Sequence, residues 1–188
     1  LLDLFAANSK QEYLDKSIMY TDFMLQHFWD EKEGNLFFTS DDHEQLISRT
    51  KNFYDLAMPS GNSMAASNLL RLYHYTQNNS YLDRAVRIMK ASSQSAAENP
   101  FGFGQMLNSI YLYVKKPVEI AVFSSDDNSN TNNSSLVAWL NRQFLPGSMI
   151  AIVHPREIAK LQYYPFFKGR EAEGGRETAF GSSRGAAR

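Results

Sequence analysis

The first part of the chain, residues 1–116, has the hydrophobic pattern of helices. Apolar positions recur at spacings of four and three residues from Leu14 to Phe28, which places them on one stripe of a helix over about residues 11–29. Three further stripes follow, at residues 65–75, 82–89 and 103–114. The pattern therefore predicts a mainly α fold.

Polar and helix-breaking residues separate the stripes. Residues 59–63 (PSGNS) are of types that break helices or cap their N-termini, and Pro100 cannot continue a helix. Ser80 is the expected N-cap of the helix that carries the stripe at residues 82–89. Residues 34–40 read as a short extended segment inside a long connection. We expect a helix at each of the four stripes, joined by connections of unequal length.

The chain repeats itself at an offset of 68 residues. Residues 1–16 (LLDLFAANSKQEYLDK) align without a gap with residues 69–84 (LLRLYHYTQNNSYLDR). Each copy has an apolar helix end, a short polar break and a second helix that opens on Tyr-Leu-Asp. This predicts a helical hairpin that is used twice. A tetratricopeptide unit is excluded, because a shift of about 34 residues loses the pattern.

Beyond residue 116 the pattern is that of strands. Residues 118–123 and 149–153 are β-prone runs, and a helix over residues 136–144 lies between them. We expect three parts: helical hairpins at 1–116, a small β-α-β element packed on the helices at 117–167, and a glycine-rich, disordered tail at 168–188.

Composition excludes several classes of function. The formal net charge is −1 and no long basic face is present, so nucleic acid is not an expected partner. The chain has no cysteine, which excludes disulfides, thiolate metal sites and cysteine nucleophiles, and we expect no cofactor. No apolar run reaches the roughly 18 residues of a membrane helix, so we expect no membrane partner and a cytoplasmic location.

Residues 49–63 carry the most specific pattern, R-x-K-x-x-Y-D-x-A-x-P-S-G-N-S. With this motif, the Leu-rich helix after it and the strand from Pro117, the chain closely resembles the C-terminal part of a family. That family comprises thioredoxin-domain-containing proteins related to spermatogenesis-associated protein 20 and the bacterial YyaL-type proteins. The resemblance covers roughly residues 1–180.

The resemblance implies a partial (α/α)6 toroid of the six-hairpin glycosidase type, followed by the β-α-β element. It also implies a thioredoxin-like domain as a partner, which we expect, with the first hairpins, outside these residues. Family members usually carry cysteines near the end. Here residues 177–180 resemble the approach to them, and the sequence then departs from the family pattern.

In hairpins joined in series, the connections that follow each second helix lie at the same end. Residues 30–61 and 98–100 should therefore share one rim, where the start of the next helix favours an anion or a sugar hydroxyl. Asp55 is the candidate catalytic residue on this rim. The candidate substrate-binding residues are Arg49, Lys51, Tyr54, Ser60, Asn62 and Ser63.

A structural interpretation of the same motif competes with the functional one. In it, Ser60 or Ser63 is only an N-cap, Pro59 and Gly61 shape the turn, and Asp55 pairs with Arg49 or Lys51. The two interpretations differ in whether the polar groups remain available to a ligand.

Carbohydrate chemistry would need further groups. A glycosidase uses two acids, and Glu44, Asp42 or a residue outside this chain is a candidate for the second. An epimerase-like enzyme would use histidine, for which His43 lies on the rim. We favour a surface or satisfied buried role for every histidine, and no pair has the spacing of metal ligands, so no metal site is expected.

Aromatic residues gather around the long connection, where they either line a sugar site or fill space between helices, the interpretation that we favour. They are Phe28, Trp29, Phe37, Phe38, Phe53 and Tyr54.

Two functions follow. The first is a toroid fragment that binds a carbohydrate or related polar metabolite, or also acts on it as a hydrolase or an epimerase-like enzyme, without a complete catalytic set in this chain. The second is a non-catalytic scaffold or regulatory module of a thioredoxin-domain protein. In either case, a partial ring should expose apolar side chains.

Overall fold

A computed structural model describes residues 1–42, 48–124, 135–140, 142–143, 145, 147–170 and 178–183. Contacts divide the chain into two compact units. We call Ile18–Val114 the helical unit, and Leu1–Ser17 with Lys115–Arg188 the sheet unit. Helix α2 (Gln11–Phe28) begins in the sheet unit and continues into the helical unit.

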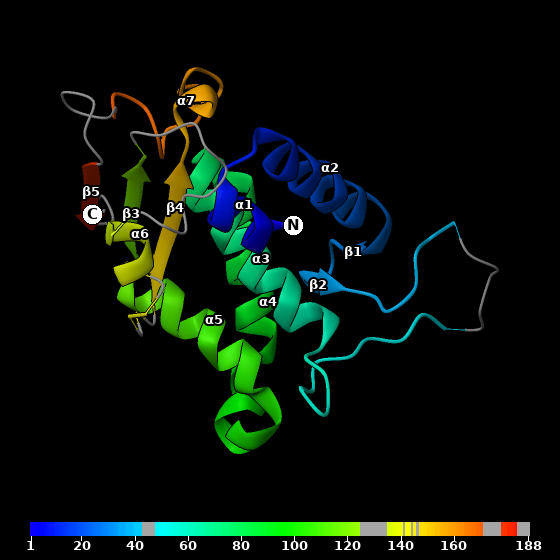
Figure 1. The fold of residues 1–188 in the computed structure, drawn as a ribbon. Coiled ribbons are helices and arrows are strands. Elements are labelled where there is room, and N and C mark those ends of the chain that lie inside the picture. Colours follow the sequence, from blue (N-terminus) through cyan, green and yellow to red (C-terminus); the bar gives the residue numbers. More distant parts are fainter. Residues whose placement is uncertain are drawn as a thin grey trace. The chain divides into compact units, whose positions relative to one another are not determined.

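The helical unit is built on the hairpin of α3 (Gly61–Thr76) and α4 (Asn79–Glu98), which pack along each other (Figure 1). A short antiparallel pair, β1 (Trp29–Asp30) and β2 (Asn35–Leu36), lies in the connection before α3. The 3-10 turn η1 (Pro100–Phe103) and α5 (Gly104–Lys115) follow α4. The core side chains of the hairpin include Ala65, Ala66, Leu69, Leu70, Leu72, Tyr75, Tyr81, Ala85 and Ile88.

The repeat predicted from the sequence is present in the backbone of two turns. Helix α1 (Leu2–Asn8) ends at Ser9, which has φ 48° and donates its N–H to Phe5 O at 2.7 Å. Sixty-eight residues later, α3 ends at Gln77, which has φ 57° and donates to Tyr73 O at 2.7 Å. A left-handed residue with this bond ends a helix and turns the chain. The predicted repeat is therefore confirmed for the turn itself, whereas packing of the two helices along each other is observed for α3 and α4.

The second helices of the two hairpins also begin alike. The N–H of Tyr13 bonds to Lys10 O at 3.0 Å, and that of Tyr81 bonds to Asn78 O at 3.1 Å. The predicted N-cap of α4 is wrong, because Asn78, two residues before Ser80, accepts the N–H of Ser80 on its Oδ1 at 3.0 Å. Asparagine caps a helix as well as serine does, and the earlier residue starts the helix.

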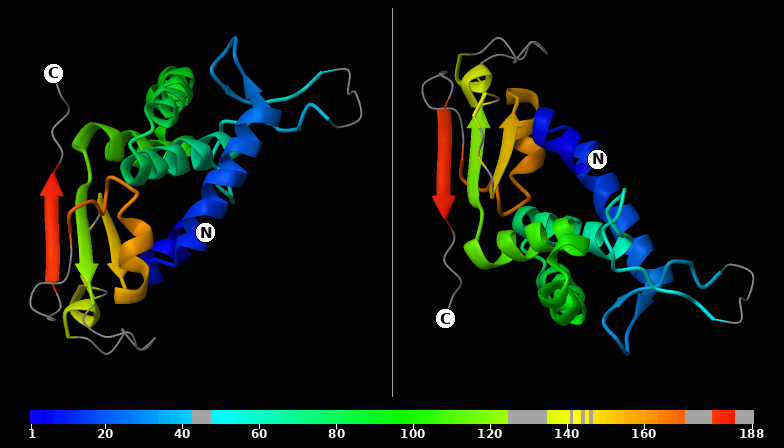
Figure 2. Two further views of the ribbon diagram at one scale, coloured as in Figure 1. Left: turned by 90° about the horizontal axis from the view of Figure 1, so that it is seen from above. Right: turned by 90° about the horizontal axis from the view of Figure 1, so that it is seen from below.

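The sheet unit contains a three-stranded sheet with β3 at its centre (Figure 2). Strand β3 (Val118–Phe123) runs parallel to β4 (Ser148–Val153), and α6 (Ser135–Leu140) lies between them in sequence. Helix α7 (Pro155–Leu161) follows β4. The predicted β-α-β element is therefore confirmed.

The predicted tail, residues 168–188, is not disordered throughout. Strand β5 (Thr178–Ser183) pairs antiparallel with β3, from Thr178 opposite Phe123 to Ser183 opposite Val118. The prediction of disorder is wrong for these six residues, because the backbone of β3 offers a ladder that composition does not reveal. Residues 171–177 and 184–188 of this tail lie outside the described residues.

The first seventeen residues group with the strands, whereas the sequence assigned them to the hairpins. Helix α1 packs on β4, and the rings of Phe5 and Phe167 meet edge to face at 6.0 Å. Tyr164 also donates its hydroxyl to Asp15 Oδ1 at 2.6 Å. Burial and the Asp15 carboxylate raise the pKa of Tyr164. The aromatic run at residues 163–167 thus closes the sheet unit onto its first helices.

Helix α5 buries a different face from the one that the periodicity indicates. Leu107 and Val114, two members of the predicted stripe, are 38% and 64% exposed, whereas Met106 and Ser109 are buried. Phe103 alone of the predicted stripe is fully buried. A helix with apolar residues on more than one side can turn either face inward, so spacing does not choose between them.

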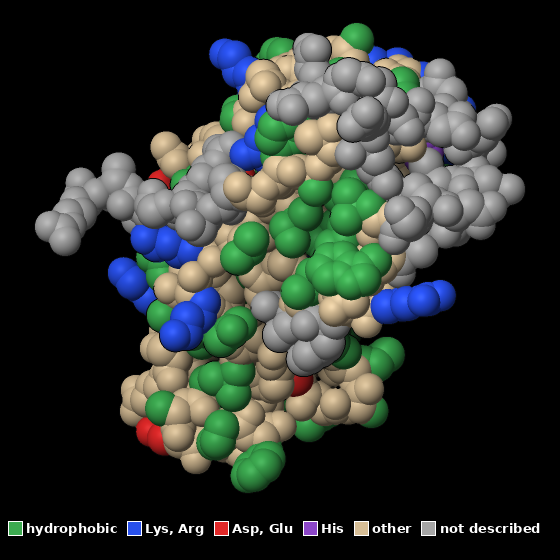
Figure 3. Space-filling view, turned by 60° about the vertical axis from the view of Figure 1, so that its left-hand side comes forward, with side chains coloured by type: hydrophobic (Ala, Val, Ile, Leu, Met, Phe, Trp, Pro, Cys, Tyr) green, Lys and Arg blue, Asp and Glu red, His purple; other side chains and the backbone are tan. Residues whose placement is uncertain are grey.

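Large apolar side chains are exposed on both units, and Figure 3 shows such side chains on one face. In the helical unit, Leu56 is 80%, Met58 78% and Phe101 96% exposed. Among the described helices, none combines the length and the apolar character that crossing a membrane requires.

Candidate functional site

The long connection from α2 to α3, which holds the predicted site, begins with the β1–β2 turn. Asp30 caps this turn, because its Oδ1 accepts the N–H groups of Lys32 at 2.9 Å and Glu33 at 3.3 Å. Gly34 has φ 68°, and a side chain there would lie 2.6 Å from Arg87 Nε. Glycine adopts a positive φ without strain and has no Cβ to clash with Arg87, so this turn requires glycine at position 34.

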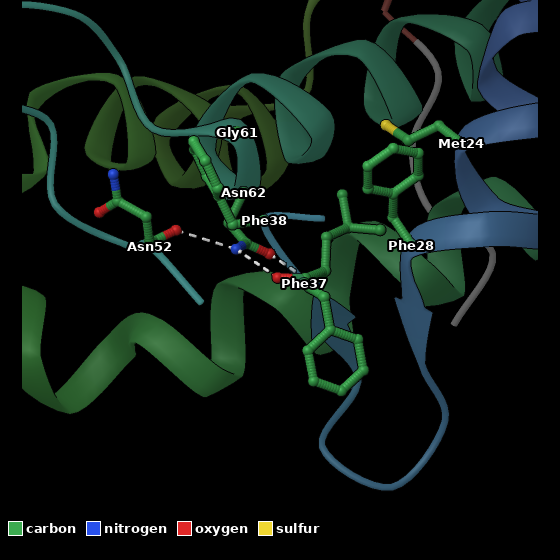
Figure 4. Close-up of a pocket in the computed structure, with 8 residues that line it drawn as sticks. Met24, Phe28, Phe37, Phe38, Asn52, Gly61 and Asn62 are labelled. Atoms are coloured by element: carbon green, nitrogen blue, oxygen red, sulfur yellow. Dashed lines mark hydrogen bonds between the residues drawn. The ribbon is translucent and has the colours of Figure 1, made fainter. Parts of the chain in front are cut away.

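Asn62, predicted to bind substrate, joins three segments of the connection. Its Oδ1 accepts the N–H of Leu36 at 2.8 Å, and its Nδ2 donates to Leu36 O at 3.0 Å and to Asn52 O at 2.9 Å (Figure 4). The side chain therefore pairs with Leu36 as a neighbouring strand would. Asn62 is 2% exposed, and both protons of its amide are used.

Asp55, predicted as the catalytic residue, links the starts of two helices. Its Oδ1 accepts the N–H of Ser60, the N-cap of α3, at 2.8 Å, and its Oδ2 accepts the N–H of Met106, in the first turn of α5, at 3.0 Å. Its own N–H donates to Gly102 O at 2.8 Å. A carboxylate is well placed at helix N-termini, where N–H groups lack partners.

The bond from Asp55 to Gly102 bears out one expectation about the rim. The connection before α3 and the connection between α4 and α5 lie together, as the order of the hairpins predicts. Tyr54 adds to this contact, because its ring packs on that of Phe103 with centroids 5.0 Å apart. Tyr54 is 48% exposed.

The two serines of the motif cap α3. Ser60 Oγ accepts the N–H of Ser63 at 3.1 Å, and the two hydroxyl groups lie 2.8 Å apart. Both residues are buried. The N-cap that the sequence predicts is thus confirmed at Ser60, and Ser63 completes it.

Arg49 and Lys51 pack on Phe37 instead of pairing with Asp55. The Arg49 guanidinium lies 4.1 Å from the Phe37 ring centroid and donates to backbone oxygens, including His27 O at 2.9 Å. Lys51 Nζ lies 4.7 Å from the same centroid and 2.5 Å from Asp30 Oδ2. The pairing of Asp55 with Arg49 or Lys51 is therefore wrong, since both cations have other partners.

The Lys51 ammonium acts on the ionisation of Asp30. Its hydrogen bond, with those from the backbone of the turn, lowers the pKa of Asp30 below the ordinary value, against the opposing effect of desolvation. The pair therefore holds a charged carboxylate at the base of the connection.

A pocket of about 240 Å³ opens beside these residues, between α2, β2 and the start of α3. Its walls are largely aromatic and aliphatic, with Phe28, Phe37 and Phe38 prominent (Figure 4). Phe38 is 69% exposed, and the Asn52 side chain is also exposed. Three of the six aromatic residues around the connection thus line a cavity, whereas Trp29 lies beneath Arg84 and Arg87, 5.6 and 5.1 Å from the ring centroid.

Two of the histidines that were considered as an acid or base are not among the lining residues of this pocket. His154 follows β4 in the sheet unit and is buried, and His74 lies in the last turn of α3. Glu44 and His43 are outside the described residues.

The structure also brings together His27, Asp41 and Asp42, whose ligand atoms lie within 4.8 Å of one another. His27 Nδ1 and Asp41 Oδ1 are 2.7 Å apart. The sequence missed this group because fourteen residues separate His27 from Asp41. Asp41 and Asp42 are exposed. Exposed acidic side chains of this kind are common on protein surfaces.

Comparison with known proteins gives relatives for most of the chain. No family model matches it. Human spermatogenesis-associated protein 20 is 26% identical over 153 residues, which are 81% of this chain and 19% of that protein. The mouse protein is 25% identical over the same shares. An uncharacterised protein of Caenorhabditis elegans, B0495.5, is 31% identical over 107 residues, or 56% of this chain and 14% of that protein. The chain spans about a fifth of the length of the mammalian relatives that it matches.

Proposed function

Because the chain is homologous to spermatogenesis-associated protein 20 over most of its length, we propose that it forms helical hairpins of a six-hairpin toroid that binds a carbohydrate or related polar metabolite. We propose further that a thioredoxin-like domain of the full-length protein works together with it. The recurrence of one hairpin turn after 68 residues supports the repeated architecture. The cytoplasmic location stays a prediction.

The pocket beside Phe37 carries the proposal of binding. Sugars present apolar C–H faces that stack on aromatic rings, and hydroxyl groups that bond to polar side chains at the edge. Phe38, which is 69% exposed, offers such a ring at the cavity, and Asn52 also lines it. The volume of about 240 Å³ suits one small ligand or ring.

The geometry supports binding more strongly than catalysis. A glycosidase acid must reach the scissile bond, with a second carboxyl roughly 5 to 9.5 Å away. Asp55 uses one oxygen on the backbone of Ser60 and the other on that of Met106. Its arrangement supports a role in holding the rim, and the proposed function therefore needs no chemistry at Asp55.

Binding is tested with the variant Phe38→Ala in the full-length protein. Phe38 is 69% exposed, so its removal should cost little stability while it takes away one wall of the pocket. A screen of neutral mono- and disaccharides by calorimetry should find a ligand of the unmodified protein that Phe38→Ala binds about tenfold more weakly. Phe101→Ala, another exposed aromatic, is the control that should keep full affinity. Equal losses in the two variants, or no sugar bound by the unmodified protein, would refute the proposal.

A second candidate is a non-catalytic scaffold of a thioredoxin-domain protein. It is favoured by the exposed apolar side chains of Leu56, Met58 and Phe101, since such side chains often mark contact surfaces. On this view, Leu56→Ser with Met58→Ser would abolish association with the thioredoxin-like domain, added as a separate chain, and leave sugar binding intact. Unchanged association would exclude this surface as the scaffold contact.

A further inference from the structure

A second pocket of the helical unit has a different chemical character. It encloses about 280 Å³ between the second half of α2 and the start of α4. Most of its lining side chains are polar, and Leu25 is the aliphatic exception. The lining residues are Asp22, Leu25, Gln26, Asn78, Ser80, Tyr81 and Arg84.

On one side of this pocket, Tyr81 orients the carboxylate of Asp22. The Tyr81 hydroxyl donates to Asp22 Oδ1 at 2.7 Å, and Tyr81 itself is only 4% exposed. The bond fixes one oxygen and leaves acceptor capacity on the carboxylate, since each oxygen has two lone pairs. Asp22 therefore presents a positioned acceptor to the cavity.

On the other side, Arg84 presents a positioned donor. Its guanidinium lies over the Trp29 ring, 5.6 Å from the centroid, and one terminal nitrogen donates to Ser80 Oγ. Its Nε–H is buried and has no acceptor among the described residues. A buried N–H without an acceptor is costly, because it has lost water and gained no bond in return.

The charges of the pocket decide which ligand it suits. Asp22 and Arg84 carry opposite charges, and the other polar lining residues with side chains at the cavity are neutral. An anion that approached Arg84 would meet the Asp22 carboxylate, and a cation that approached Asp22 would meet the guanidinium. A hydroxyl group avoids both conflicts, because it donates to the carboxylate and accepts from the N–H.

We propose that the pocket between α2 and α4 is a binding site for a neutral polyhydroxyl ligand, such as a sugar or a cyclitol, with Asp22 as acceptor and Arg84 as donor. The site is separate from the pocket beside Phe37, and its assignment holds whether or not that pocket binds a ligand. It lies between α2 and the start of α4, and none of its lining residues belongs to the motif at residues 49–63.

The test uses the 188-residue chain and three probes. They are myo-inositol as a neutral polyol, inorganic phosphate as an anion and tetramethylammonium as a cation. The readout is the NMR signal of the Arg84 Nε–H, assigned by its loss in Arg84→Lys. Saturable shifts with myo-inositol, and none with either ion, are the expected result. No shift with myo-inositol, or a stronger response to phosphate, would overturn the proposal.

Variants separate the site from a general effect on the fold. Arg84→Lys keeps the charge but loses the Nε–H, and should weaken myo-inositol binding about tenfold by calorimetry. Arg87→Lys is the matched control, because Arg87 also lies over Trp29 but does not line the pocket. It should bind as the unmodified chain does, and an equal loss in both variants would contradict the site.

A change of charge gives a second, independent outcome. In Asp22→Asn the amide oxygen can still accept the Tyr81 hydroxyl, so the hydrogen bond between the two side chains is kept. The pocket, however, gains a net positive charge. Binding of myo-inositol should fall several-fold and binding of phosphate should appear. Phe38→Ala should change neither, which distinguishes failure of this site from failure of the pocket beside Phe37. A phosphate affinity that Asp22→Asn leaves unchanged would show that Asp22 does not face the ligand.

Discussion

The two ends of helix α3 use polar side chains in opposite ways. At its start, Asp55 and Asn62 give their hydrogen-bonding groups to the backbone of the connection and of α5. Beyond its end, where α4 begins, Asp22 accepts the Tyr81 hydroxyl, and Arg84 keeps a buried N–H that has no acceptor in the part of the chain that the structure describes. The polar motif most distinctive in sequence is thus the more fully satisfied, and the groups suited to a ligand lie outside that motif.

This contrast teaches how a polar cluster should be judged. The number of polar residues shows only that hydrogen bonds are needed, whereas the groups left over after the fold is made show where a ligand can bind. The contrast predicts that substitutions at the start of α3 act mainly on stability. Substitutions near the start of α4 should act mainly on binding.

The largest effect is expected for Asn62→Ala. The change removes three hydrogen bonds and leaves the buried N–H and carbonyl of Leu36 without their partner, which should cost about 3 kcal/mol of unfolding free energy. Urea unfolding followed by circular dichroism measures it. Asn52→Ala is the control and should cost less than about 1 kcal/mol, since its exposed side chain accepts only the N–H of Tyr54. Equal costs would break the contrast.

A smaller loss is expected for Asp55→Asn. The amide oxygen of the variant can accept the N–H group at one helix start, but its NH2 group then faces the N–H group at the other. The change should therefore cost about 2 kcal/mol of unfolding free energy. Glu98→Gln makes the same chemical change at an exposed site where the bond from Gln94 can persist, and should be nearly neutral. If Asp55→Asn keeps full stability and abolishes sugar binding, the functional interpretation of Asp55 is restored.

Tyr81→Phe compares the two hairpins directly. Loss of the hydroxyl that bonds to Asp22 should cost about 1 kcal/mol and weaken myo-inositol binding, because the carboxylate is no longer oriented. Tyr13→Phe, at the equivalent position 68 residues earlier, should cost less, since no bond of its hydroxyl is present among the described residues. Thermal unfolding and calorimetry on both variants decide the matter. A larger effect at Tyr13 would be contrary to the comparison.

The smallest effect is a dependence on pH at Asp30. Its folded pKa is lowered by Lys51, so the pair contributes stability that is present above the ordinary carboxyl pKa of about 4 and is lost as the pH falls through the lower folded value. The difference in stability between the unmodified chain and Lys51→Gln should therefore shrink as the pH is lowered below about 4. A difference that stays constant down to pH 2 would show that Lys51 acts through its packing on Phe37 alone.

Local patterns predicted the elements of the chain well. The β-α-β element followed from apolar runs, and the two hairpin turns followed from the repeat, since the same local sequence forms the same left-handed cap in both places. The start of α4 was misplaced by two residues because Asn78 and Ser80 are both good caps. Local propensity ranks such residues without deciding between neighbours.

Contacts between segments that are distant in sequence could not be predicted from local patterns. The prediction that Asp55 meets a cation failed because its partners are backbone N–H groups, one of them 51 residues away at Met106, and every sequence has these. Strand β5 was missed for a similar reason, since its pairing depends on the ladder that β3 offers. The pocket at Arg84 forms only where α2 meets α4, and the repeat that includes Tyr81 and Arg84 does not indicate this meeting.

The single carboxylate of Asp55 has a mechanical consequence for the rim. Because it holds the first turns of α3 and α5 at once, and its own N–H holds Gly102, neither loop can swing outward unless the other is released too. The exposed apolar side chains of these two loops, Met58 and Phe101, should therefore move together as one rigid unit.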